Sequence, residues 1–103
     1  MEKISEKFED IISAGKPVLV DFYATWCGPC QAQAPILHQV NASVGDKAIV
    51  LKIDVDRNSG VAAKYGVRSV PTLMLFVDGA MVWREAGLHQ REALLEVIGR
   101  HIR

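Results

Sequence analysis

The two cysteines of this chain, Cys27 and Cys30, are separated only by Gly28 and Pro29. Two thiols at this spacing can form a disulfide, but the ring that they close is very small. In the loop-entropy treatment such a ring stabilises a fold by roughly 2 kcal/mol, against about 3 kcal/mol for a 15-residue loop. A purely structural disulfide is therefore disfavoured, and we interpret the pair as a redox-active dithiol.

The dithiol lies between two predicted elements. It follows an apolar run at residues 18–24 and opens a segment with a helical pattern, residues 28–44. Unpaired backbone amides and the helix dipole favour negative charge at the start of a helix, which stabilises a thiolate there. We therefore expect Cys27 to be the attacking thiol. Cys30, one turn deeper and expected to be more buried, would resolve the mixed disulfide that Cys27 forms with a substrate.

A zinc site is the other use of closely spaced cysteines. Tetrahedral zinc needs four ligands, and the candidates that remain are His38, His89 and His101, at unrelated spacings. We expect core or surface positions for these histidines and no bound metal. Asp54 and Asp56 are expected at a strand end and in a helix cap, and not in a metal site.

Two charged residues interrupt predicted buried strands. Asp21 is the single charge in residues 18–24, and Lys52 is the single charge in residues 49–53. If the first strand is buried on both faces, ionisation of Asp21 is costly and its pKa should rise. Such a carboxylate could take the proton from Cys30 as this thiol attacks the mixed disulfide. The alternative is that both charged side chains point to solvent at a strand end.

The composition restricts the function further. At 103 residues the chain can form one domain with a single core, and its hydrophobic content of 50% argues against disorder. Twelve basic and twelve acidic residues give a formal net charge of zero, which removes the electrostatic argument for binding nucleic acid or an acidic membrane. Neither a signal-peptide pattern nor an apolar run of membrane-spanning length is found, so we expect a cytoplasmic protein.

The elements that position these residues follow from hydrophobic periodicity and turn signals. We predict strands at residues 18–24, 48–55, 71–77 and 81–86, and helices at residues 4–13, 28–44, 59–65 and 89–102. Strands that alternate with helices indicate an α/β protein with a parallel core. The Asp78-Gly79 turn adds an antiparallel hairpin between the last two strands.

Several of these segments resemble one known family. The sequences WCGPC at residues 26–30, VDFYA at 20–24 and VPTL at 70–73 are similar to those of thioredoxins, in register from about Phe8 to the end of the chain. The resemblance implies a single thioredoxin domain, residues 1–103, with a central mixed sheet of four to five strands flanked by helices on both faces. Because the N-terminus is short, we expect the first edge strand of the family to be missing or reduced to a few residues.

The resemblance also implies an activity and its partners. Thioredoxins reduce disulfides in client proteins with their dithiol as the only redox group, and an NADPH-dependent flavoprotein reductase, thioredoxin reductase, recycles the oxidised form. Nothing in the sequence requires more than a monomer. Two other uses of the fold are weighed against this activity. Oxidases and isomerases of exported compartments usually have histidine where this chain has Pro29, and a binding module would use an apolar surface without turnover.

Further implications concern single residues. Thioredoxins have an aspartate and a lysine at the positions of Asp21 and Lys52, which implies a partly buried pair. They carry a cis proline at the position of Pro71, packed beside the dithiol, and this leaves the backbone of Val70 free to pair with an extended substrate. The residues alone would favour a trans proline at the start of a strand.

The surface that meets the client is expected to be apolar and to surround Cys27. This client patch is expected to consist of Trp26, Gly28, Pro29, Val70, Pro71 and Gly87. Two neighbours depart from the common family pattern, because Gln31 stands in place of a frequent lysine and Thr25 in place of an acidic or other polar residue. Loss of the cation should raise the pKa of Cys27 slightly and change which partners match the protein in charge.

Overall fold

The computed structural model of the chain describes residues 4–102, with side chains from Lys7 onward. The strands are β1 (Val18–Tyr23), β2 (Ile49–Asp54), β3 (Thr72–Val77) and β4 (Ala80–Ala86). The helices are α1 (Ile4–Ile12), α2 (Gly28–Val44), α3 (Ser59–Lys64) and α4 (Arg91–Gly99), with a short 3₁₀ turn at Gly45–Lys47. The predicted elements are therefore all present, and the largest difference is the last helix, which begins two residues later and ends three residues earlier than predicted.

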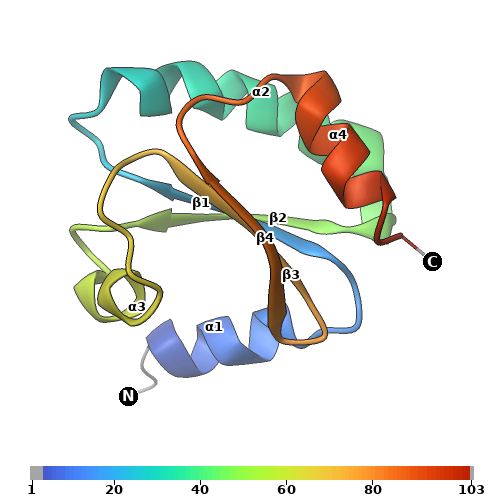
Figure 1. Cartoon of the computed structure of the whole chain (residues 1–103), viewed down its shortest axis with the longest axis horizontal. Helices are drawn as coiled ribbons and strands as arrows, with labels where there is room; N and C mark the ends of the chain where they lie inside the picture. The colour runs from blue at the N-terminus through green and yellow to red at the C-terminus, as the bar shows by residue number, and fades with distance from the viewer. Residues whose placement is uncertain (1–3, 103) are drawn as a thin grey trace.

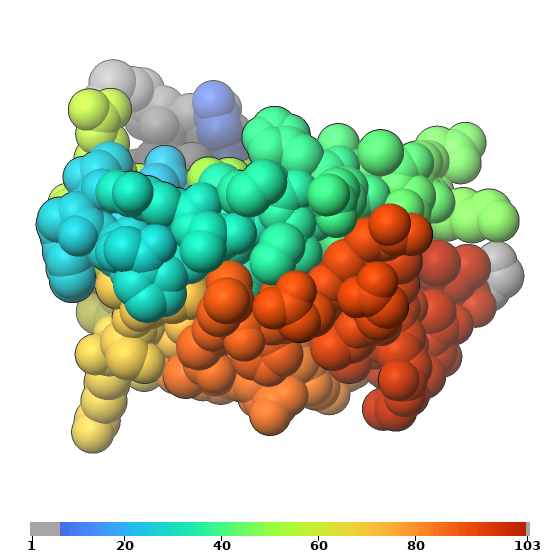
Figure 2. Space-filling model, turned by 90° about the horizontal axis from the view of Figure 1, so that it is seen from above, coloured from blue at the N-terminus to red at the C-terminus, as the bar shows by residue number. Residues whose placement is uncertain are grey.

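The sheet has the strand order β2-β1-β3-β4 and is covered on both faces, as predicted. α1 and α3 lie on one face, and α2 and α4 lie on the other (Figure 1). Figure 2, which looks onto the second face, shows α2 and α4 side by side over the sheet. This arrangement is the four-stranded form of the mixed sheet that the sequence analysis expected.

The alternation of side chains along β1 explains why both faces need a cover. Val20 and Phe22 pack with Phe8 of α1 in one cluster of buried residues. Leu19 packs in a second cluster with residues of α2 and α4. Because side chains alternate along a strand, Asp21 falls on the same face as Leu19, beneath the helix that carries the dithiol.

The predicted parallel core is limited to one pair of strands. β1 and β2 are parallel, whereas β3 runs antiparallel to β1 and β4 runs antiparallel to β3. The connection from β2 to β3 contains one short helix, α3, of six residues. The chain re-enters the sheet at the end where β2 leaves it, which brings Val70 and Pro71 to the dithiol.

The N-terminal edge of the sheet is reduced in the described part of the chain. Residues 4–12 form α1, and no strand precedes β1 within residues 4–102, so β2 is an edge strand. The first three residues lie outside the described range. No helix within residues 4–102 combines the length and the apolar character needed to cross a membrane.

Candidate active site

The dithiol sits where the chain leaves β1 and enters α2. Cys27 is the N-cap residue of α2, with an extended backbone, and its N–H donates to the carbonyl oxygen of Ala24 at 3.3 Å. Pro29 lies in the first turn of the helix, where no backbone N–H is required. Cys27 and Cys30 form a disulfide with their Cα atoms 5.2 Å apart. The local sequence thus supplies both the helix start and the spacing of the two sulfurs.

The sulfur of Cys27 takes the place of an N-cap oxygen. The backbone N–H of Cys30 donates to Sγ of Cys27 at 3.2 Å. A hydrogen bond to the sulfur and the positive end of the helix dipole both favour its thiolate form in the reduced protein. The prediction that Cys30 is the more buried cysteine is wrong, because each of the two residues is 4% exposed. Its position at the start of the helix, and not its exposure, distinguishes Cys27 from Cys30 as the expected attacking thiol.

The loop before β3 closes over the dithiol. The Val70–Pro71 peptide bond is cis, which confirms the prediction made from the resemblance. The carbonyl oxygen of Val70 lies 3.6 Å from Sγ of Cys27, a contact that becomes a hydrogen bond when the reduced cysteine carries a thiol proton. The N–H of Gly87 donates to the carbonyl oxygen of Pro71 at 2.8 Å. The loop before β3 therefore contacts the sulfur of Cys27, and the loop after β4 contacts Pro71. Figure 2 shows the first of these loops beside the start of α2.

The members of the client patch lie together, but they differ in exposure. Trp26 is the most exposed large apolar residue of the described chain, at 71%. The exposed members are Trp26, Gly28 and Pro29, the half-buried ones are Val70 and Gly87, and Pro71 is buried. The patch is therefore an apolar rim around the sulfur, with Pro71 as its floor.

The indole ring of Trp26 forms a hydrogen bond with Asp56, a residue that the sequence analysis assigned to a helix cap. Nε1 of Trp26 donates to Oδ2 of Asp56 at 2.9 Å. A small hollow of about 150 Å³ lies between this ring, Val55 and the loop at residues 67–70. Asp54 ends β2 as predicted and accepts the N–H of Asp56. The prediction of Asp56 as a helix cap is wrong, because the N-cap residue of α3 is Asn58. The carboxylate of Asp56 instead contacts a ring 30 positions away in the chain, and no local pattern reports such a contact.

Asp21 is fully buried in the centre of the sheet. Its exposure is 0%, and neither of its carboxylate oxygens has a hydrogen-bond partner among the described residues. Burial raises the pKa of Asp21 from 3.8 to about 6, although attraction to Lys52 acts in the opposite direction. The alternative in which Asp21 points to solvent is therefore wrong, and the pKa shift predicted from its position in an apolar strand is confirmed.

Lys52 lies opposite Asp21 in the register of β1 and β2, but its side chain is exposed. Its Nζ atom lies 4.5 Å from the centre of the Tyr23 ring, a cation–π arrangement. Of the partly buried pair that the resemblance implies, only Asp21 is buried. For Lys52 the alternative of an exposed side chain is correct. Tyr23, Cys30 and Lys52 line one open hollow of about 210 Å³, although Cys30 itself is buried.

The two residues that depart from the family pattern contact each other. Nε2 of Gln31 donates to the carbonyl oxygen of Thr25 at 3.4 Å.

Gln33 is a fully buried polar residue that the sequence analysis overlooked. It lies on the stripe of α2 with the spacing of Cys30, Leu37 and Val40, so helical periodicity could have found it. Among the side chains that the structure describes, those of residues 7–102, no group of three histidine, cysteine or acidic residues could hold a metal ion.

Comparisons with known proteins agree with this geometry. The thioredoxin family model matches residues 1–100. The thioredoxin of Bacillus subtilis (strain 168) is 47% identical over 85 residues, 82% of each chain. The thioredoxin of Rickettsia bellii (strain RML369-C) is 42% identical over 94 residues, 91% of this chain and 90% of that protein. Among solved structures, a mutant thioredoxin from Halobacterium salinarum NRC-1 has a TM-score of 0.86 at 43% identity, covering 95% of this chain and 85% of that one.

Proposed function

Since this chain belongs to the thioredoxin family and is a dithiol protein-disulfide reductase that acts on client proteins, we propose that Cys27 attacks the client disulfide and Cys30 releases the client. The observation that carries this assignment is the hydrogen bond from the Cys30 N–H to Sγ of Cys27 at the start of α2. It supports a thiolate on Cys27, and the thiolate is the nucleophile in disulfide exchange.

The reaction then takes two exchange steps. The Cys27 thiolate attacks one sulfur of the client disulfide, a mixed disulfide forms, and the second client sulfur leaves as a thiolate. Cys30 next loses its proton and attacks Sγ of Cys27, and the first client sulfur leaves. The client gains two electrons, and the protein is left with the Cys27–Cys30 disulfide, which is the oxidised form described above.

Asp21 is proposed as the base for the second step. A carboxylate with a pKa of about 6 is a stronger base than an ordinary aspartate and is still largely ionised at neutral pH. Its place on the α2 face of β1 supports transfer of the Cys30 proton to it. Lys52 is proposed to moderate this base, because its charge lowers the pKa that burial raises.

The client patch is proposed to bind an extended apolar segment of the client. Trp26, Gly28, Pro29, Val70 and Gly87 offer apolar surface around the sulfur, above Pro71. The contact between Val70 and Cys27 supports pairing of the client backbone with the loop before β3. None of these patch residues carries a charge, which suits binding of an apolar client segment.

The remaining assignments concern the setting of the reaction. We propose that the chain acts as one monomeric domain, residues 1–103, with no redox group beyond its dithiol and no role in binding nucleic acid or membranes. An NADPH-dependent flavoprotein thioredoxin reductase would return the disulfide to the dithiol. The cytoplasm is the proposed location, since thiols are kept reduced there.

Trapping tests the roles of the two cysteines. With a disulfide-bonded client, NADPH and a bacterial thioredoxin reductase, the native chain should turn over. Cys30→Ser should accumulate a covalent mixed disulfide with the client, and Cys27→Ser should accumulate none. Trapping by Cys27→Ser alone would reverse the roles. A reduction potential above that of glutathione would instead indicate disulfide formation in an oxidising compartment.

A further inference from the structure

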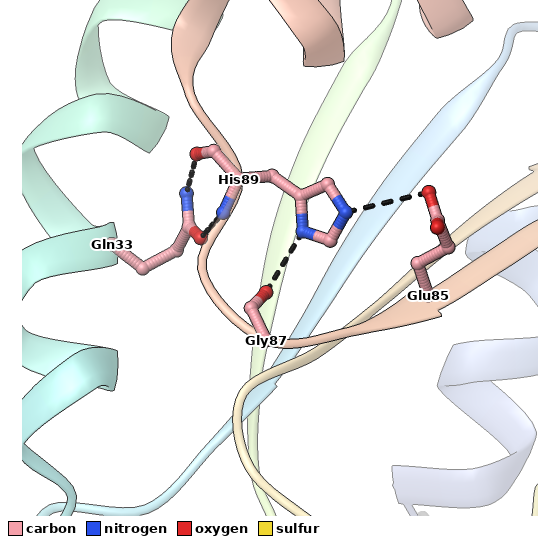
Figure 3. Close-up of polar contacts among 4 residues, drawn as sticks. All are labelled: Gln33, Glu85, Gly87 and His89. Carbon is pink, nitrogen blue, oxygen red and sulfur yellow. Dashed lines mark hydrogen bonds and ion pairs between the residues drawn. The ribbon is translucent and has the colours of Figure 1, made fainter.

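Gln33 forms two hydrogen bonds with the loop that connects β4 and α4. Its Nε2 donates to the carbonyl oxygen of His89 at 3.0 Å, and its Oε1 accepts the backbone N–H of His89 at 2.8 Å (Figure 3). The side chain is 0% exposed. Because a primary amide carries a donor and an acceptor in fixed geometry, the two bonds set both the position and the orientation of one peptide segment relative to α2.

This segment is connected to the client patch through Gly87. Nδ1 of His89 lies 2.8 Å from the carbonyl oxygen of Gly87, and since a carbonyl oxygen only accepts, the ring nitrogen is the donor. The N–H of Gly87 in turn donates to the carbonyl oxygen of Pro71 at 2.8 Å. A continuous series of hydrogen bonds therefore runs from Gln33 to the floor of the patch.

The imidazole ring of His89 contacts two residues of β4. Nε2 of His89 lies 3.4 Å from Oε2 of Glu85, and the imidazole ring packs against Trp83 in a T-shaped contact with 5.5 Å between centroids. Figure 3 shows the ring between Gly87 and Glu85, while the backbone of His89 faces Gln33. The backbone of His89 thus contacts α2, whereas its imidazole ring contacts β4 and the loop that follows it.

We propose that Gln33 is a positioning residue for client binding, which fixes Gly87 and the backbone of Pro71 relative to the dithiol on the same helix. The inference rests on the proposed function, in which Gly87 and Pro71 belong to the client patch. Gln33 follows Cys30 by three residues on α2, so one rigid helix holds both the chemistry and the loop that meets the client. Loss of the two hydrogen bonds between Gln33 and His89 should weaken client binding and leave the dithiol chemistry intact.

The test replaces Gln33 by methionine, which is similar in length and shape but cannot form either bond. The control is Gln39→Met, the same change at an exposed position of α2. For Gln33→Met, KM for a protein disulfide should rise by up to about tenfold, with kcat nearly unchanged. The rate with a small aromatic disulfide, which needs no extended surface, should equal that of the native chain. Gln39→Met should match the native chain in both assays.

Amide hydrogen exchange provides a readout that does not depend on activity. In the native chain the amides of His89 and Gly87 should exchange more slowly than those of Leu88 and Gln90, and this comparison needs no variant. In folded Gln33→Met the protection at His89 and Gly87 should fall, and that at Val20 in the core should not. Unchanged protection in the variant, an unchanged KM, or unprotected amides in the native chain would overturn the inference. Failure of the native chain to reduce the protein disulfide would overturn the proposed function, whatever the exchange data show.

Discussion

Asp21 of β1 and Lys52 of β2 are paired in the parallel register of the two strands, but only the aspartate is buried. The lysine ammonium reaches outward over the ring of Tyr23. Lys52 therefore stabilises the ionised carboxylate less than burial destabilises it, and the pKa of Asp21 rises to about 6. The carboxyl group consequently changes its charge within the pH range in which thiol chemistry is usually measured.

This pKa makes the stability of the fold depend on pH. Between about pH 4 and pH 6 the folded state holds a proton on Asp21 that the unfolded state has lost, since the pKa rises from 3.8 to about 6 on folding. Stability therefore falls as the pH rises through this window, by up to about 3 kcal/mol from this group. Asp21→Asn should remove this loss. The variant should therefore be more stable than the native chain at pH 8 and about equally stable at pH 4.

Urea unfolding of both proteins at pH 4 and pH 8 measures this difference directly. The gain at pH 8 should be smaller than about 3 kcal/mol, because a buried asparagine amide also costs free energy if it lacks partners. Comparing the two proteins at each pH cancels the contribution of all other titrating groups. A stability difference between the variant and the native chain that is the same at pH 4 and at pH 8 would contradict a buried Asp21 with a raised pKa.

The same substitution should slow the release of the client. If Asp21 takes the proton from Cys30, its loss should lower the rate of the second exchange step by up to about 100-fold, the lower end of the usual contribution of a general base. The first step, attack by Cys27, should change little. Stopped-flow measurement of the two steps from pH 5 to pH 9 separates them. A native-like second step over this whole range would remove the role of Asp21.

The features that the sequence predicts here are those carried by nearby residues. The WCGPC motif and the apolar run at residues 18–24 are enough to place a dithiol between a strand and a helix. The lone charge of Asp21 within this run is enough to predict its shifted pKa. In each case the evidence lies within a few positions along the chain, where periodicity and the dipole of one helix determine the outcome.

Contacts between distant segments escaped prediction for the same reason. The antiparallel direction of β3 is a property of its pairing with β1, a distant segment of the chain, and periodicity does not report such a pairing. The bond between Trp26 and Asp56 and the bonds between Gln33 and His89 join residues 30 and 56 positions apart. A buried polar side chain at an apolar helix position, as at Gln33, is nevertheless a signal that a single sequence contains.

Cys27 should react first with an alkylating reagent in the reduced protein. Both cysteines are 4% exposed, so accessibility alone predicts little selectivity. The Cys30 N–H and the start of α2 favour the thiolate of Cys27, and the thiolate is the reactive form. Iodoacetamide labelling near pH 7, followed by mass spectrometry of the peptides, gives the order of reaction. Faster labelling of Cys30 would mean that the helix start does not govern reactivity.

Asp56 should affect client binding more than stability. Its hydrogen bond to Trp26 joins two exposed residues, and such bonds contribute about 1 kcal/mol or less to folding. Asp56→Ala should therefore change the free energy of unfolding by less than about 1 kcal/mol. By freeing the indole ring, it should raise KM for a protein disulfide several-fold, since ordering a large side chain costs about 1 kcal/mol on binding. Asp46→Ala, at an exposed acidic residue of the 3₁₀ turn, is the matched control and should leave KM unchanged. A large loss of stability without a change in KM would instead assign Asp56 to the fold alone.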